Sequence, residues 1–181
     1  MSVEARVSPE WFATVNHCTP NNGMIGNAYV FAAGLASALK VGAVLASIFM
    51  LLGSAIILTL GAIHLMYAFS GKKLTPRDPA QQMRMADVSP VLTRETTMWK
   101  AWVGFNASHS YGAILFGVVY GYLAVTHREV LFNSPFLLAV GLAVLCGWLV
   151  LGKVYRFSIP FRGILVATVC YVLSVALRLI A

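Results

Sequence analysis

Four hydrogen-bonding side chains stand close together in the segment WKAWVGFNASHSYG, which occupies residues 99–112. Asn106, Ser108, His109 and Ser110 fall within five consecutive residues, and an apolar stretch follows them. An imidazole among such groups can move a proton, bind a polar ligand or coordinate a metal or haem. This segment is therefore the first place in the sequence where chemistry is expected.

One face of the segment groups the residues that could form a site. At 100° per residue along a helix, Trp102, Asn106 and His109 fall within about 60° of one another. We predict one buried pocket toward the cytoplasmic half, lined by Asn106 and His109, with Trp102 at its mouth. A second histidine, His64, lies in the preceding apolar stretch and contributes from a neighbouring antiparallel helix. The two imidazoles would differ in depth by roughly 8 Å, at 1.5 Å per residue, so no direct contact between them is implied.

A second face of the same segment carries small residues. Gly104, Ser108 and Gly112 recur every four residues, more than a third of a turn from the polar face. Small residues at this spacing let the backbones of two membrane helices approach closely. We therefore expect these three positions to line a close helix contact.

The two intramembrane histidines leave several kinds of chemistry open. They could make structural hydrogen bonds between helices, handle protons, or bind a polar ligand such as a quinone or haem. A zinc site is disfavoured, because zinc takes three or four ligands and no Asp or Glu lies in any expected span. No Ser-His-Asp set, phosphate-binding glycine loop or HExxH motif is present. Catalysis therefore stays open, with haem or quinone as the candidate cofactors and no metal site.

The composition indicates whether these residues lie in a soluble protein or in a membrane protein. Of 181 residues, 59% are apolar and only 10% are charged, and the mean hydropathy is +0.79. A soluble protein of this size would need more polar surface. The net charge of +7 comes from basic residues that flank apolar stretches, which indicates a membrane-surface bias and not nucleic-acid binding. The chain is therefore predicted to be an all-α integral membrane protein.

Apolar stretches long enough to cross a hydrocarbon layer of about 30 Å recur along the chain. We expect residues 43–181 to form a four-transmembrane-helix bundle, with spans at about 43–69, 99–125, 134–152 and 160–179. Pro160 is expected at the start of the last helix, because proline suits the first helical turn.

The amino-terminal region differs from the rest. Residues 1–23 are polar, with two prolines and an Asn-Asn-Gly turn, and are predicted to be an extramembrane tail. Residues 24–42 contain an apolar run too short to span the membrane before Lys40, so a short interfacial or re-entrant helix is expected there.

Basic residues are distributed unevenly between the two sides. The loop after the first span, up to Lys100, holds six Lys or Arg and the third loop holds three, against four elsewhere. The positive-inside rule then places both loops in the cytoplasm and both termini outside. Arg77, Arg156 and Arg162 are candidate contacts for lipid headgroups or another anion.

Several short motifs resemble a family of small uncharacterised bacterial four-span membrane proteins. The likeness covers roughly residues 46–165 and rests on IHL (63–65), PRD (76–78), MWKAWVGFNASHSYGAILFG (98–117) and YRFSIP (155–160). The resemblance implies four spans in a bacterial inner membrane and directs attention to His64, Asp78, Asn106 and His109. It brings no activity with it.

Two classes of function follow from these patterns. The first is a non-catalytic helical bundle, either a subunit of a larger membrane assembly or a binder of a lipid-like ligand, because packing stripes are plentiful and catalytic sets are absent. The second is a small membrane oxidoreductase or cofactor protein that uses His64 and His109 with haem or quinone. Expected partners are the lipid bilayer and other membrane subunits or further copies of the chain, and no nucleic acid.

Overall fold

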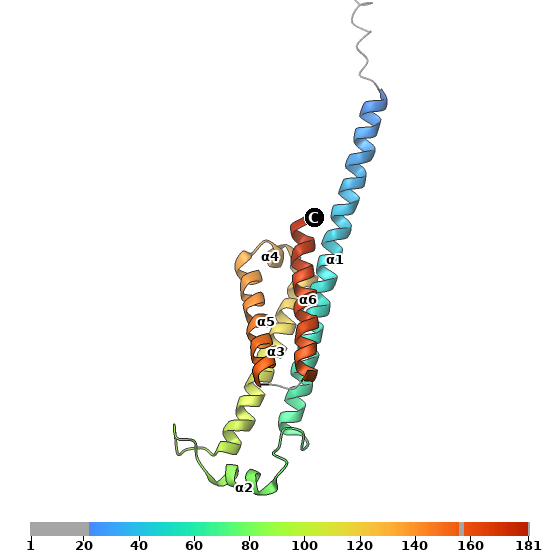
Figure 1. The fold of residues 1–181 in the computed structure, drawn as a ribbon. Coiled ribbons are helices and arrows are strands. Elements are labelled where there is room, and N and C mark those ends of the chain that lie inside the picture. The colour runs from blue at the N-terminus through green and yellow to red at the C-terminus, as the bar shows by residue number, and fades with distance from the viewer. Residues whose placement is uncertain (1–21, 156–157, 181) are drawn as a thin grey trace, which may run out of the picture. The chain divides into compact units, whose positions relative to one another are not determined.

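The computed structural model describes residues 22–155 and 158–180, and all their regular secondary structure is α-helical. Six helices follow one another along this part of the chain: α1 (Asn22–Phe69), α2 (Pro79–Asp87), α3 (Met98–Thr126), α4 (Arg128–Phe132), α5 (Pro135–Tyr155) and α6 (Ser158–Ile180) (Figure 1). Arg156 lies outside the described residues.

The chain divides into two compact units, residues 1–41 and 42–181. In the first unit, the described residues are helical and belong to α1. Its apolar side chains are exposed, as shown by Val30 and Phe31, with 74% and 76% of their surface accessible. The sequence predicts a separate helix at 24–42, whereas α1 is assigned without a break through residue 42. An interfacial position for residues 24–42 stays a prediction.

Three helices of the described chain are both long and apolar enough to cross a membrane. They are Val30–Phe69, the apolar part of α1, together with α5 and α6. α3 is also long, with 29 residues, but it is less apolar because it contains the polar run that includes Asn106 and His109. The described part of the chain is therefore all-helical, and its three long apolar helices indicate membrane association.

In the second unit, the later part of α1 packs against both α3 and α6. Gly117 on α3 lies so close to α1 that a Cβ built there would be 2.6 Å from the Leu58 Cβ and 2.7 Å from the Ser54 carbonyl oxygen. Toward the other end of this contact, a Cβ at Gly61 would lie 2.8 Å from the Ala113 Cβ on α3. The missing side chains are what allow the two backbones to approach.

The contact between α1 and α6 also combines a small residue with a hydrogen bond. A Cβ at Gly53 would lie 3.0 Å from the Ala167 carbonyl oxygen, and the Ser174 hydroxyl donates to the Ala46 carbonyl oxygen at 2.6 Å. Ser174 and Ala46 are both fully buried. A serine whose hydroxyl bonds the neighbouring backbone can thus replace an apolar residue in this interior.

Two tyrosines fasten the first turns of α5. Tyr120 on α3 donates its hydroxyl to the Leu137 carbonyl oxygen at 2.7 Å, and Tyr171 on α6 donates to that of Leu138 at 2.8 Å. Gly141 leaves the space for both rings, because a Cβ there would meet the Tyr171 hydroxyl at 2.5 Å. These contacts join α3, α5 and α6 near one end of the helices.

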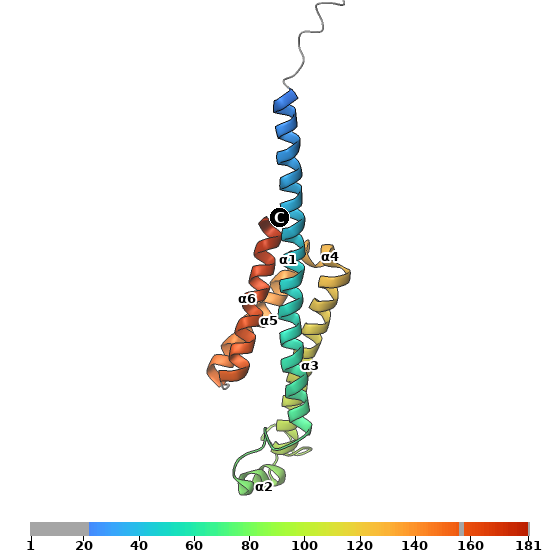
Figure 2. The same ribbon diagram turned by 90° about the vertical axis from the view of Figure 1, so that its right-hand side faces the viewer.

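The loop after α1 contains the short helix α2, which lies beyond the ends of α1 and α3 (Figures 1 and 2). α2 begins at Pro79, and the Asp78 carboxylate accepts a hydrogen bond from the Ala80 backbone N–H at 2.9 Å. Asp78 therefore has a structural explanation as a helix cap. Thr97 caps α3 in the same manner, accepting from the Lys100 N–H at 3.4 Å.

Candidate functional site

A cavity of about 130 Å³ lies within the second unit, between α1, α3, α5 and the start of α6. Its walls are almost entirely apolar, and most of its few polar groups are the imidazoles of His64 and His109, the indole of Trp148 and the hydroxyls of Tyr67 and Ser110. The apolar lining is supplied by Ile57, Leu60, Gly61, Ile63, Ala113, Ile159, Pro160 and Ile164. A site of this kind suits an apolar group that also carries a hydrogen-bonding atom.

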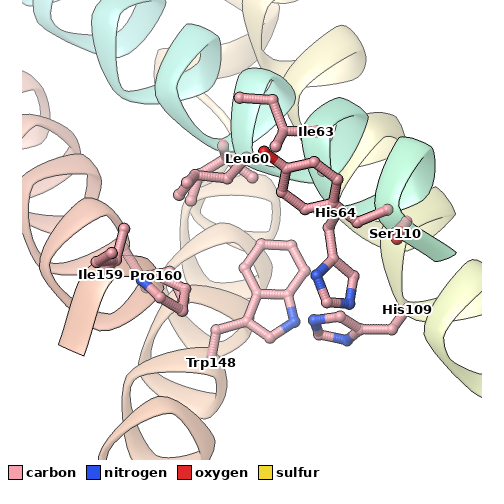
Figure 3. Close-up of a pocket in the computed structure, with 13 residues that line it drawn as sticks. Leu60, Ile63, His64, His109, Ser110, Trp148, Ile159 and Pro160 are labelled. Atoms are coloured by element: carbon pink, nitrogen blue, oxygen red, sulfur yellow. The ribbon is translucent and has the colours of Figure 1, made fainter. Parts of the chain in front are cut away.

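The two histidines lie side by side at this cavity. Their ring centroids are 5.9 Å apart and their planes are nearly perpendicular, at 84°. The Trp148 indole stands next to them, with its centroid 6.2 Å from that of His109, and Ile159 and Pro160 lie beyond it (Figure 3). Residues from α1, α3 and α5 thus bring three nitrogen-containing rings together.

Asn106 lies between this cavity and a second one, because it lines the second cavity and contacts His64, which lines the first. Its side-chain Oδ1 lies 3.1 Å from the His64 Nε2, and its Nδ2 donates to the Trp102 carbonyl oxygen at 2.8 Å. Asn106 is 8% exposed, so its amide is oriented by protein groups on both sides. Because the amide oxygen is an acceptor, the assigned orientation favours the His64 tautomer that carries its proton on Nε2.

The second cavity measures about 260 Å³ and is more polar. Trp102 and Asn106 line it from α3, and Lys72 and Thr75 line it from the loop after α1. The Trp102 indole N–H donates to the Leu74 carbonyl oxygen at 3.0 Å and so holds the loop against α3. Tyr67 lines both cavities, and its hydroxyl accepts from the Lys73 ammonium at 2.9 Å.

The sequence predicts one pocket for four residues, whereas the structure divides them between two cavities. His64 and His109 line the apolar cavity, and Trp102 and Asn106 line the polar one. The contact between Asn106 and His64 is the boundary between the two sets. Trp102, Asn106 and His109 do share one face of α3. His64 on α1 contacts this face at Asn106, and Trp102 and His109 therefore lie on opposite sides of that contact.

The proximity of the imidazoles also differs from the depth estimate of roughly 8 Å. That estimate places the end of α1 level with the start of α3. The pairing of Gly61 with Ala113 and of Leu58 with Gly117 shows a different register, in which α3 extends past the end of α1 by about seven residues, or roughly 11 Å. This offset brings His64 to the level of His109.

The stripe of Gly104, Ser108 and Gly112 makes no close helix contact within the described chain. A Cβ at Gly104 or Gly112 would have nothing within 4 Å, and the exposed Ser108 hydroxyl bonds the Phe105 carbonyl oxygen of its own helix at 2.9 Å. The close contact expected at this stripe is made by Gly117, on another face of α3. Both faces carry small residues, so spacing alone did not distinguish them.

The remaining predicted contacts concern the arginines. Arg77 and Arg162 are exposed, in the loop before α2 and near the start of α6 respectively. Arg156 is outside the described residues, as noted above. Contact of these residues with lipid headgroups stays a prediction.

Trp148 is a polar lining residue that sequence reasoning missed, because an isolated tryptophan in an apolar stretch is expected to pack. It does pack, with its centroid 5.6 Å from that of Phe116, but its indole also borders the cavity beside His109. Its partners come from α3, so no spacing within α5 points to this position.

The lining residues differ in how well they suit the candidate cofactors. Haem does not fit this cavity, because a porphyrin is a ring of four linked pyrroles and a cavity of comparable size to this one accommodates a single benzene. The His64 Nε2 is also engaged by Asn106. In the described residues, no group of three or more His, Cys, Asp or Glu could hold a metal ion. A quinone ring is of the right size and could bond an imidazole.

Comparison of the chain with protein-family models, curated proteins and solved structures finds no match. The resemblance to small bacterial four-span proteins therefore stays a prediction, and the function has to be argued from the cavity itself.

Proposed function

We propose that the protein is a four-span integral membrane protein that binds a lipid-like molecule and holds the polar group of that molecule at His64 and His109. The observation that carries this proposal is the position of two imidazoles in a largely apolar cavity of about 130 Å³. Polar side chains at membrane depth are costly, and they usually mark a site when they face a cavity.

The size of the cavity limits the part of the ligand that it can hold. A cavity of about 150 Å³ accommodates one benzene ring, whereas whole drug-sized ligands occupy at least about 300 Å³. The proposed ligand therefore inserts one ring or a short chain segment, and the rest of the molecule extends outside the cavity. A carbonyl or hydroxyl on the inserted part would bond an imidazole. Quinones and other isoprenoid or acyl lipids belong to this class.

The four-span architecture is part of the same proposal. α1, α5 and α6 are apolar enough to span a membrane, and α3 packs against them with its polar face turned inward to the cavity. A polar face that is covered by protein removes the main objection to placing α3 in lipid. The charge distribution favours an orientation with the loop between α1 and α3 in the cytoplasm and both termini outside, and a bacterial inner membrane is proposed on the resemblance alone.

A role as a subunit of a larger assembly is compatible with ligand binding. Gly104 and Gly112 are exposed on α3, where a helix of another subunit or another copy could approach closely. An oxidoreductase that uses a quinone would occupy the same cavity, but it would also need an electron donor. Ligand binding is therefore the function that the geometry supports best.

The test uses a brominated long-chain alcohol as the probe, because bromine quenches a tryptophan that it touches. Titration of the purified protein should quench Trp148 fluorescence saturably, and Trp148→Phe should remove the saturable part. His109→Leu should weaken binding by between about twofold and tenfold, which corresponds to the loss of one hydrogen bond. Ser108→Leu is the matched control, because Ser108 lies beside His109 in sequence but is exposed and does not line the cavity.

Two results would contradict the proposal. One is quenching that rises linearly with probe concentration in the wild-type protein, which indicates partition into the detergent and not binding. The other is equal affinity in His109→Leu and Ser108→Leu, which would show that the imidazole takes no part.

A further inference from the structure

A tight turn in the loop between α2 and α3 presents two large apolar side chains. The Thr93 backbone N–H donates to the Pro90 carbonyl oxygen at 3.3 Å, which makes Val91 and Leu92 the central residues of a β-turn. Central turn positions favour Pro, Gly, Asn and Asp. Val91 and Leu92 are instead 109% and 94% exposed, so their surfaces contact no other part of the described chain.

The loop that carries the turn is held in shape by its own hydrogen bonds. At its base, the Met98 N–H donates to the Val88 carbonyl oxygen at 2.9 Å, and the Glu95 N–H donates to the Thr93 hydroxyl at 3.1 Å. The two apolar residues are therefore displayed at the tip of an ordered loop. Display of this kind costs free energy in water, since apolar surface of this size is favourably buried.

The position of the loop places the tip near the expected membrane surface. α3 begins at Met98, which is followed by Trp99, and tryptophan is a residue type that is enriched at membrane–water interfaces. Met98 is six positions after Leu92, so even a fully extended chain keeps the tip within about 20 Å of that level. The loop between α2 and α3 is also at the end of the helices in both views (Figures 1 and 2).

The charge of this region favours a negatively charged surface. Residues 70–100 contain six Lys or Arg and three Asp or Glu, which gives a net charge of 6 − 3 = +3. Arg94, two residues from Leu92, is exposed. Anionic lipids attract basic segments that lie next to a membrane, and apolar side chains beside them can enter the headgroup region.

We propose that Val91 and Leu92 insert into the interfacial region of an anionic bilayer, while Arg94 contacts the lipid headgroups. The loop between α2 and α3 then fixes the adjacent end of α3 relative to the lipid surface. The interaction is independent of the ligand cavity and requires only lipid, so it is testable in vesicles without any partner protein.

The experiment places a polarity-sensitive fluorophore on the turn. Leu92→Cys is labelled in a variant in which serine replaces the three native cysteines, at positions 18, 146 and 170. The protein is reconstituted in vesicles of phosphatidylcholine, with or without phosphatidylglycerol. A label at Gln81→Cys, on the exposed surface of α2, serves as the matched control.

The label at position 92 should emit at shorter wavelength than the label at 81, be quenched by nitroxide lipids and be protected from aqueous iodide. Phosphatidylglycerol should strengthen the effect, and raising the salt from about 0.1 M to 1 M should weaken this added part, because the Debye length falls from about 10 to 3 Å. Arg94→Gln should reduce the effect of phosphatidylglycerol, whereas Arg128→Gln, in α4 just past the opposite end of α3, should leave it unchanged.

Equal iodide access at positions 92 and 81 in both kinds of vesicle would overturn the proposal. So would a label at 92 that is protected in native membranes but accessible in pure lipid vesicles, since that result would assign the turn to a partner protein. Protection without any dependence on phosphatidylglycerol or on Arg94 would refute the anionic part of the proposal.

Discussion

The close approach of α1 and α3 can be tested by adding a single methyl group at Gly117. A Cβ there would lie 2.6 Å from the Leu58 Cβ, 2.7 Å from the Ser54 carbonyl oxygen and 2.9 Å from the Leu58 Cα. Two carbon atoms in contact normally lie about 3.5–4.0 Å apart, so one helix must move by roughly 1 Å to accept the methyl group. Two of the three obstructing atoms belong to the backbone of α1, which cannot rotate away.

Gly112→Ala provides the matched control on the same helix. A Cβ at Gly112 would have nothing within 4 Å, so the substitution adds no clash. Both variants gain the same helix propensity, up to about 1 kcal/mol, and this gain cancels when the two are compared. Overpacking costs about 1–3 kcal/mol, so Gly117→Ala should be less stable than Gly112→Ala by that amount.

The measurement is reversible unfolding in mixed micelles, followed by helix content as the denaturing detergent is increased. The wild-type free energy of unfolding should fall between those of the two variants, or lie close to that of Gly112→Ala. If Gly117→Ala and Gly112→Ala unfold at the same detergent fraction, the close contact of α1 with α3 at Gly117 is refuted.

Three further results are expected. Cysteines placed in the loop 70–98 should resist a membrane-impermeant reagent in intact cells, and cysteines in the amino-terminal tail should react; the reverse pattern would invert the proposed orientation. Tyr171→Phe removes the hydrogen bond to the Leu138 carbonyl oxygen and should lower the free energy of unfolding by about 0.5–1.5 kcal/mol, while an unchanged value would show that this bond contributes nothing. Ser54→Ala should raise that free energy by about 1 kcal/mol, because the buried Ser54 hydroxyl has no partner within the described chain; a loss of stability would mean that the hydroxyl is bonded after all.

The helices themselves were largely predictable from the sequence. Long apolar stretches indicate α5 and α6 because each residue there must be compatible with lipid, and the expected start of a span near residue 99 lies one residue from the observed start of α3 at Met98. These are local properties. The short helix α2 was missed even though Asp78 and Pro79 are a typical cap and first residue, because its nine residues carry no apolar periodicity that stands out.

The arrangement of the site depended on information that is not local. The polar face of α3 correctly directs attention to Asn106 and His109, but the register between α1 and α3 decides that Asn106 meets His64. That register is set by the contact at Gly117, and nothing within α3 distinguishes this small residue from Gly112. Trp148 could not be placed at the cavity for the same reason, since its neighbours come from other helices.

The hydrogen bond from Ser174 to the Ala46 carbonyl oxygen has a consequence for biosynthesis. The two residues are 128 positions apart, so at roughly 5–20 residues per second the ribosome adds Ser174 about 6 to 26 s after Ala46. During this interval, the face of α1 that α6 later covers must be shielded by lipid or by the insertion machinery. Newly made α1 is therefore expected to be the segment most exposed to membrane proteases and to mispairing with foreign helices. This exposure of α1 would end when α6 is inserted and packs against it.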